Sequence, residues 1–393
     1  MSTEMLLPPE LIDEISARIE GKSSLCSMCL ASKTTRSSAL PFLFAAITLS
    51  SEEDVETWSE MLKHSPELGT RIVRKVKLSK HPTRRLLPEM TSVLFRMPSV
   101  QRIVLHAPKF DPHFWKTVTT YLPIFPNKTE LYLTARFIEW GMLLDILGAF
   151  QTMKALVFLD TCSLGPSAID AVSAFQSRVP SSRFDLSKLE RLVLQRSYPD
   201  IGYALLNHSP PAALRSVVLN GLSPSPLPVF AKLMAVTVES LESISVRSKL
   251  TSEHLQIFER VESFPALRSF TMQVGKYPST FMERFPPAPN LRLFIFRAIM
   301  REDHSALEYV DKLMGILRGG QDLHKFPRLG ELKFQIRAVV SHPFEPKSDV
   351  NASQRGEFRA QVESKVREGI TDWRGRLSFE WFDQELENMW SCE

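Results

Sequence analysis

Cysteine is scarce in this chain of 393 residues. Its four cysteines, Cys26, Cys29, Cys162 and Cys392, are too few and too scattered for the disulfide framework of a small secreted protein. The first residues also lack the basic segment that precedes the apolar core of a signal peptide. Both absences favour a reducing compartment, so we expect a cytoplasmic or nuclear protein.

Long apolar runs are absent as well. No segment reaches the roughly 18 apolar residues that a membrane-spanning helix requires. The richest stretch, residues 141–150, is short and contains Asp145. It therefore predicts a buried helix, and we expect no membrane as a partner.

The residue patterns of common enzyme sites are missing. The chain has only 15 glycines and no Gly-rich phosphate loop, HExxH, GxSxG or kinase signature, which disfavours a nucleotide-binding enzyme. Its nine histidines are dispersed, and none is paired with an acid at catalytic or metal-ligand spacing. Cys26 and Cys29 form a CxxC without a second ligand pair, so we interpret them as helix-packing residues and not as zinc ligands. We expect no catalytic residue, no cofactor and no metal.

A strong excess of one charge is also absent. The net charge of +4, with 23% charged residues, gives no general case for nucleic-acid binding. One local cluster is basic and contains no acid: Arg71, Arg74, Lys75, Lys77, Lys80, Arg84 and Arg85. Because no aromatic residues are interleaved with these side chains, base stacking is not available there. We favour a solvated edge of the fold, and the alternative is a phosphate or nucleic-acid site within residues 71–85.

What the chain does contain is a repeat. Six-residue segments with apolar residues at positions 1, 4 and 6 occur at 73–78, 100–105, 189–194, 214–219, 241–246, 267–272, 291–296 and 329–334, and less regularly at 128–133 and 153–158. Their sixth residues are 24 to 28 residues apart, except for intervals of 36 and 38 that indicate insertions. This period is typical of leucine-rich repeats.

Helical patterns lie between these strand candidates, at 86–96, 138–150, 227–238, 252–264 and 306–317. A single strand, loop and helix cannot bury its apolar residues alone, so neighbouring units must stack. We therefore predict an α/β fold in which residues 50–340 form an irregular leucine-rich-repeat solenoid with parallel strands inside and helices outside. Beyond it, 342–346 predicts a loop, 354–369 a charged helix and 377–382 a strand, which we interpret as a C-terminal cap with an acidic tail over 341–393.

The first 49 residues predict a bundle of three short helices. Pro8 and Pro9 suit the first turn of a helix, and Glu10 complements its N-terminus. In this first helix Leu11, Ile15 and Ile19 follow at four-residue spacing with Ile12 beside them, and Gly21 is placed to end it. Ser23 or Ser24 would cap a second helix, whose apolar residues are Leu25, Met28 and Cys29. A third helix is predicted through Leu40, Leu43 and Phe44. Such a small bundle leaves apolar surface for a partner or for the rest of the chain to cover.

This bundle resembles an F-box, the module that binds the Skp adaptor of cullin-RING ubiquitin ligases. The resemblance rests on LPPEL at 7–11, LCSMCLASK at 25–33 and ALPFLF at 39–44, in F-box order and spacing. The chain departs from the pattern at Thr35, where many members carry a tryptophan. An ordinary helical cap on a larger domain is the alternative. Together with the degenerate repeats, the F-box resembles the large group of fungal F-box proteins.

The resemblance implies a substrate-recognition subunit of an SCF-type ubiquitin ligase, without chemistry of its own. It implies partners of two kinds, a Skp-family adaptor with its cullin-RING ligase and an unknown target protein. The apolar residues that a small bundle leaves uncovered then form the adaptor-binding surface: Leu7, Pro8, Pro9, Leu11, Ile15, Leu25, Cys29 and Leu30. The rivals are an interaction scaffold outside ubiquitination and the phosphate or nucleic-acid binder described above.

A target would bind the strand residues that alternate with the buried ones. Side chains alternate along a strand, so positions 5 and 7 of each repeat share the inner face. We expect target contacts from Tyr132, Val193, Gln195, Asn220 and Arg247, with the tyrosine and the arginine as anchors. The alternative is that these residues merely suit strands and are covered by the C-terminal segment or a loop.

Overall fold

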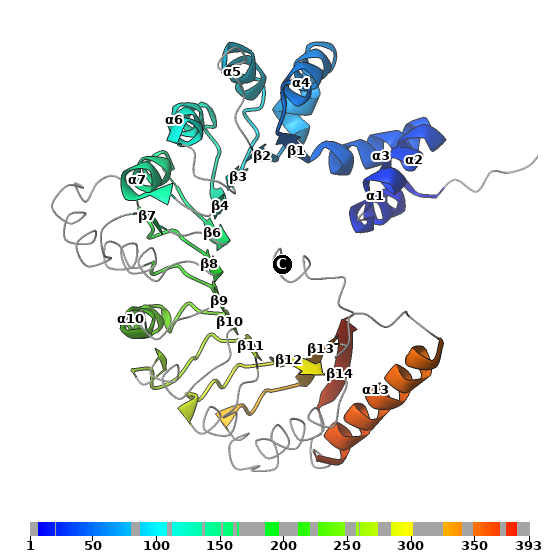
Figure 1. Cartoon of the computed structure of the whole chain (residues 1–393), viewed down its shortest axis with the longest axis vertical. Coiled ribbons are helices and arrows are strands. Elements are labelled where there is room, and N and C mark those ends of the chain that lie inside the picture. The colour runs from blue at the N-terminus through cyan, green and yellow to red at the C-terminus, as the bar shows by residue number, and fades with distance from the viewer. Residues whose placement is uncertain are drawn as a thin grey trace, which may run out of the picture. The chain divides into compact units, whose positions relative to one another are not determined.

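The structure is a computed structural model (Figure 1). It describes residues 7–19, 21–79, 87–107, 112–135, 138–150, 152–159, 163–164, 185–195, 211–220, 227–247, 257–258, 260–273, 284–301, 325–339, 349–369 and 375–382. The chain divides into two compact units. The first comprises Met1–Leu156, Asp160–Ser167 and Arg178–Asp185, and the second comprises Val157–Leu159, Ala168–Ser177 and Leu186–Glu393.

The first unit begins with helices and continues with strand and helix repeats. Its elements are α1 (Pro9–Arg18), α2 (Lys22–Ala31), α3 (Lys33–Phe44), β1 (Ala46–Leu49), α4 (Glu52–His64), η1 (Leu68–Ile72), β2 (Lys75–Ser79), α5 (Leu87–Phe95), β3 (Arg102–Ala107), α6 (Pro112–Tyr121), η3 (Leu122–Ile124), β4 (Glu130–Ala135), β5 (Ile138–Glu139), α7 (Trp140–Gly148), β6 (Ala155–Leu159) and β7 (Ser163–Leu164). Helices α4 to α7 lie on one side of the strands (Figure 1).

The second unit carries the remaining repeats. Its described elements are β8 (Arg191–Gln195), β9 (Ser216–Asn220), α10 (Leu227–Thr237), β10 (Ser243–Val246), β11 (Ser269–Gln273), β12 (Leu293–Arg301), β13 (Glu331–Val339), α13 (Asp349–Gly369) and β14 (Arg376–Phe382). The charged helix and the final strand that the sequence predicts are both present, as α13 and β14. Strand β14 pairs in parallel with β13, so it extends the sheet.

Among the described residues, the main sheet has twelve strands, which follow one another in the order of the sequence. They run β1-β2-β3-β4 in the first unit and β8-β9-β10-β11-β12-β13-β14 in the second, and β6, which follows β4 in the order, is divided between the two units at Leu156. Position 4 of one repeat faces position 4 of the next, as in the parallel register that joins Ile244 to Phe270 and Phe270 to Phe294. All ten predicted segments are strands of this sheet, which confirms the leucine-rich-repeat type of α/β fold.

The repeat pattern defines the core. At positions 4 and 6 of the ten segments no side chain is more than 3% exposed, Leu192 and Leu194 included. A buried apolar residue also stands at position 1 of nine segments. Since apolar burial is the main stabilising contribution to folding, stacking of these three rows holds the repeats together.

A tight turn precedes six of the ten repeat strands. In these six the position 1 amide donates to a carbonyl three residues earlier, as Leu267 N does to Phe264 O at 3.4 Å. One carbonyl of the preceding repeat then accepts hydrogen bonds from two successive amides. Glu242 O, for example, is 2.8 Å from Arg268 N and 3.1 Å from Ser269 N. The same arrangement recurs between successive repeats, so the residues at position 2 form a row along the start of the strands.

Some predicted elements differ from the structure. Strand β1 and helices α4 and α6 were not predicted, and residues 138–139 form the short strand β5 where a helix was expected. The signal for β1 was present, because Phe44, Ile47 and Leu49 repeat the 1, 4 and 6 pattern. Helices expected over 86–96 and 227–238 are present as α5 and α10. The helix expected over 252–264 lies partly, and that over 306–317 and the loop at 342–346 wholly, outside the described residues.

One repeat carries a lysine at position 1. Lys128 is 7% exposed, its Nζ donates to Phe125 O at 3.0 Å, and it lies 5.5 Å from the centre of the Phe150 ring. Burial lowers the pKa of Lys128, because an ammonium is poorly solvated in an apolar surrounding. This single repeat therefore buries a cation where the others bury a hydrocarbon.

Replacing Lys128 with methionine should stabilise the chain at pH 7 by on the order of 1 kcal/mol, because it removes the buried charge and keeps the volume. The native chain binds fewer protons than the unfolded chain between the lowered pKa of Lys128 and its ordinary value. Wild-type stability should therefore rise relative to the variant as the pH increases toward about 10. Denaturant unfolding at several pH values measures this difference. A variant less stable than wild type, with a difference in unfolding free energy that does not change with pH, would contradict a buried Lys128 of lowered pKa.

Candidate functional site

The N-terminal helices form a small core of their own. Helices α1 and α2 both pack on α3. The core contains Ile12 and Ser16 from α1, Leu25 from α2 and Ala39 from α3, all less than 9% exposed. The Ser16 hydroxyl donates to Ile12 O at 2.8 Å, so this buried hydroxyl has a hydrogen-bond partner.

Helix α1 presents a second apolar face to solvent. Leu11 and Ile15 on α1 are 46% and 45% exposed, and Leu7, two residues before the helix begins, is 55% exposed. Their four-residue spacing places Leu11 and Ile15 on one face of α1, next to the buried positions Ile12 and Ser16. Leu30 at the end of α2 is 80% exposed, and Phe42 on α3 is 42% exposed. Large apolar side chains that are exposed together on so small a bundle are typical of an interaction surface.

Most of the residues predicted to bind an adaptor are accessible. Pro8 and Pro9 are exposed at the start of α1, as their suitability for a first helical turn predicts, and Cys29 is partly exposed. Leu25 is the exception and needs correction. It is 3% exposed and belongs to the core of the bundle, because its position on α2 faces α3.

The helix boundaries also differ from the prediction. Helix α1 ends at Arg18, and Gly21 is the N-cap residue of α2, not the end of α1. Ser23 and Ser24 lie in the first turn of α2 and cap nothing.

Thr35, at the position where the F-box pattern often has tryptophan, connects α2 to α3 through hydrogen bonds. Ser32 and Thr35 form a capping box, in which Thr35 N donates to Ser32 Oγ at 3.1 Å and Ser32 N donates to Thr35 Oγ1 at 3.0 Å. The Thr35 hydroxyl also donates to Met28 O at 2.7 Å. A hydrogen-bonded hydroxyl thus holds the junction where an aromatic ring would otherwise pack.

The cysteines form no metal site in the part of the chain that the structure describes. Cys26 is exposed and Cys29 partly exposed, and both are free thiols. Cys26 is therefore not a packing residue, because its side chain faces solvent. No group of three or more possible metal ligands occurs among the described residues. Cys162 and Cys392 lie outside them.

In the first unit, the inner strand face has one aromatic residue with a cation beside it. Tyr132 on β4 is partly exposed, and the Arg102 guanidinium lies 4.8 Å from the centre of its ring. Arg102 Nε also donates to Glu130 Oε2 at 2.6 Å. On the same face, burial and then the charge of Lys77 lower the pKa of His106, so His106 is neutral at pH 7. Tyr132 is accessible and held in place.

In the second unit, the predicted target residues differ in exposure. Asn220 and Arg247 are partly exposed, whereas Val193 is 6% exposed. Gln195 is the last residue of β8, and its side chain lies outside the described part. Val218 is buried as well, so these valines do not form an apolar stripe open to water.

A polar network covers the same face at the last strands, and sequence reasoning missed it. Arg297 Nε donates to Gln335 Oε1 at 2.6 Å, Gln335 Nε2 donates to Glu380 Oε2 at 2.9 Å, and Lys333 pairs with Glu380. Burial opposes ionisation of Glu380, but bonds from Lys333 and Gln335 and the charges of Lys333 and Arg297 outweigh it and lower its pKa. The sequence shows the polar residues at position 7, but only the register of β14 brings their side chains into hydrogen-bonding contact.

The basic cluster is only partly described. Arg71 and Arg74 are exposed, and Arg74 Nη1 donates to Ser99 O at 3.4 Å. Lys75 and Lys77 are partly exposed at positions 3 and 5 of β2, on the inner strand face. Lys80, Arg84 and Arg85 lie outside the described residues. Among the described residues, no helix is both long enough and apolar enough to cross a bilayer.

Comparisons with known proteins give no family. No model of a known protein family matches the chain, and no curated protein matches it. The solved structures that are similar to the chain include a TLR13-ssRNA13 complex, with 13% identity, coverage of 79% of this chain and 36% of that chain, and a TM-score of 0.39. The leucine-rich repeat-containing protein LegL7 from Legionella pneumophila has 15% identity, 84% and 98% coverage and a TM-score of 0.43, and the Rad7 and Elc1 complex in yeast has 11% identity, 80% and 93% coverage and a TM-score of 0.30.

The extent of these similarities is limited. This chain spans only 36% of the matched chain in the TLR13 complex. Similarities at such low sequence identity concern the fold alone. They carry no information about the partners or the chemistry of this chain.

Proposed function

We propose that this chain is a substrate-recognition subunit of an SCF-type ubiquitin ligase. In this proposal helices α1 to α3 bind a Skp-family adaptor, and the repeats hold a target protein. The observation that carries it is the exposed apolar face of α1, formed by Leu11 and Ile15 together with Leu7 just before the helix, beside a core that is already filled by Ile12 and Leu25. The bundle does not need this face for its own core, so a bound partner is expected to cover it.

The order of the sequence supports the same role. The F-box-like motifs occupy the N-terminal helices, and the repeats follow directly at β1. An adaptor site on one element and a row of strands on another would let one chain hold two proteins. For the target we propose Tyr132 in the first unit and Asn220 and Arg247 in the second, because these side chains are accessible on the inner strand face.

The test of adaptor binding is a pair of matched double variants on α1. Leu11→Lys with Ile15→Lys places two cations on the apolar face, and Asp13→Lys with Ala17→Lys places two at the same spacing on exposed positions elsewhere on α1. Fully burying a leucine or isoleucine contributes about 1.5–3 kcal/mol, so the first variant should lose at least tenfold in adaptor affinity. The second should bind as wild type does.

Pull-down with a purified Skp-family adaptor, followed by calorimetric titration, measures the effect, and circular dichroism checks that both variants are folded. Equal binding by the two variants would remove the α1 face from the interface. Two other outcomes favour the rival functions. Capture of a target without any adaptor binding indicates an interaction scaffold. Binding to polyanions that weakens with salt and requires Arg71 and Arg74 indicates the basic cluster.

A further inference from the structure

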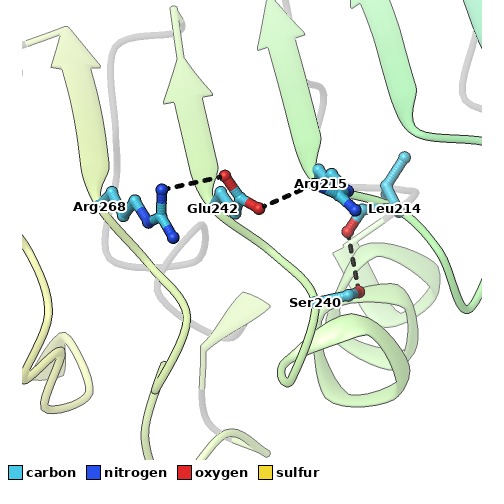
Figure 2. Close-up of polar contacts among 5 residues, drawn as sticks. All are labelled: Leu214, Arg215, Ser240, Glu242 and Arg268. Atoms are coloured by element: carbon cyan, nitrogen blue, oxygen red, sulfur yellow. Dashed lines mark hydrogen bonds and ion pairs between the residues drawn. The ribbon is translucent and has the colours of Figure 1, made fainter.

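The row of position 2 residues in the second unit is rich in arginine. Figure 2 shows Glu242 between Arg215 and Arg268 at the start of neighbouring strands. Arg215 Nη1 lies 3.3 Å from Glu242 Oε1, and Arg268 Nη1 lies 3.8 Å from Glu242 Oε2. Arg292 follows at position 2 of the next repeat, where its carbonyl accepts the amides of Gly330 and Glu331. A single carboxylate thus stands among several guanidinium groups.

Glu242, Arg268 and Arg292 line a pocket of about 230 Å³. Its lining residues come from four successive repeats and are Glu242, Ala266, Arg268, Asn290, Arg292 and Arg328. The pocket is open to solvent, since the Arg268 side chain is 64% exposed and that of Glu242 is 34% exposed. Ala266 contributes only a methyl group, which leaves room for a ligand.

Two of the three lining arginines are held in place. Asn290 Nδ2 donates to Pro265 O at 2.7 Å, which fixes its amide, and Asn290 Oδ1 accepts from Arg328 Nη1 at 2.7 Å. Glu242 holds Arg268. The Arg292 side chain makes no hydrogen bond or ion pair with any residue that the structure describes. Arg292 therefore has its full set of donors available to a ligand.

Charge and shape together indicate the class of ligand. Three arginines and one glutamate give the lining a net charge of +2. Guanidinium groups bind phosphate through paired, charge-assisted hydrogen bonds, and three of them can each engage different oxygens of a tetrahedral dianion. A carboxylate offers one charge and two oxygens, which leaves one arginine uncompensated. We propose that this pocket binds a phosphate monoester group. This inference is independent of adaptor binding by the N-terminal helices.

Thermal shift and calorimetry of the full chain with inorganic phosphate test the site. Phosphate should raise the melting temperature, while acetate at the same ionic strength should not, because binding to the native state alone stabilises it. Arg292→Gln should weaken phosphate binding about tenfold, the loss expected for one charge-assisted hydrogen bond. Ala266→Phe should weaken it at least as much by filling the pocket without changing its charge. Arg260→Gln, an exposed arginine outside the lining, is the matched control.

The same titration identifies the source of the phosphate. A phosphoserine peptide that binds more tightly than inorganic phosphate and than adenosine monophosphate assigns the site to a modified protein. The reverse order assigns it to a nucleotide, and equal affinities assign it to free phosphate. Wild-type affinity in both Arg292→Gln and Ala266→Phe, or equal stabilisation by acetate, would overturn the proposal.

Discussion

Replacing Phe270 with alanine should destabilise the second unit by about 3–5 kcal/mol. Phe270 is completely buried at position 4 of β11, and its ring centre lies 4.5 Å from that of Phe285 and 5.2 Å from that of Phe294. Truncation would leave a cavity that rings packed edge to face cannot close, so both the transfer and the cavity contributions are lost. Urea unfolding of the full chain followed by circular dichroism measures the change.

Two controls separate packing from a general effect of substitution. Phe270→Leu keeps most of the apolar volume and should cost clearly less than the alanine variant. Ser269→Ala changes the neighbouring, partly exposed residue and should stay within about 0.5 kcal/mol of wild type. An alanine variant at position 270 as stable as Ser269→Ala would contradict the repeat core.

Replacing Gly69 with alanine should destabilise the first unit by roughly 1–3 kcal/mol or more. Gly69 is buried in η1, and a Cβ there would stand 2.1 Å from Arg96 O and 3.0 Å from Leu62 Cδ2. A backbone carbonyl cannot rotate away as a flexible side chain does, so η1 and the end of α5 would have to separate. Hydrogen exchange over β2 and β3 should show the loss as faster exchange of their amides.

Gly141 provides the matched control in the same unit. A Cβ added there meets nothing within 4 Å, because Gly141 is exposed in the first turn of α7. Gly141→Ala should therefore be neutral or stabilise the chain by up to about 1 kcal/mol, since alanine favours helix. The same chemical change is thus predicted to have opposite signs at two sites, and equal effects would contradict the close approach at Gly69.

Much of this fold could be predicted from the sequence because each repeat has apolar residues at the same three positions. Leu192 and Leu194 stand two residues apart and both face the core, as alternation along a strand requires. Strand β1 was missed although Phe44, Ile47 and Leu49 carry the same spacing, because Phe44 also ends the third helical pattern. Where one residue serves two periodicities, the sequence does not separate the elements.

The candidate sites were less predictable, for a physical reason in each case. Leu25 and Leu11 are equally apolar, and only the packing of α1 and α2 on α3 decides that Leu25 is buried and Leu11 exposed. The arginine pocket combines position 2 residues with Asn290 and Arg328 from turns of later repeats. Their proximity depends on strand register across insertions of unequal length, which spacing alone does not define.

The most direct test of the proposed function is reconstitution with purified components. The full chain, a Skp-family adaptor and a cullin N-terminal domain are mixed and separated by size-exclusion chromatography with light scattering. The proposal predicts a one-to-one complex of chain and adaptor that brings the cullin into the same peak, and no cullin in that peak when the adaptor is omitted. A folded chain that elutes alone in the presence of excess adaptor would contradict it.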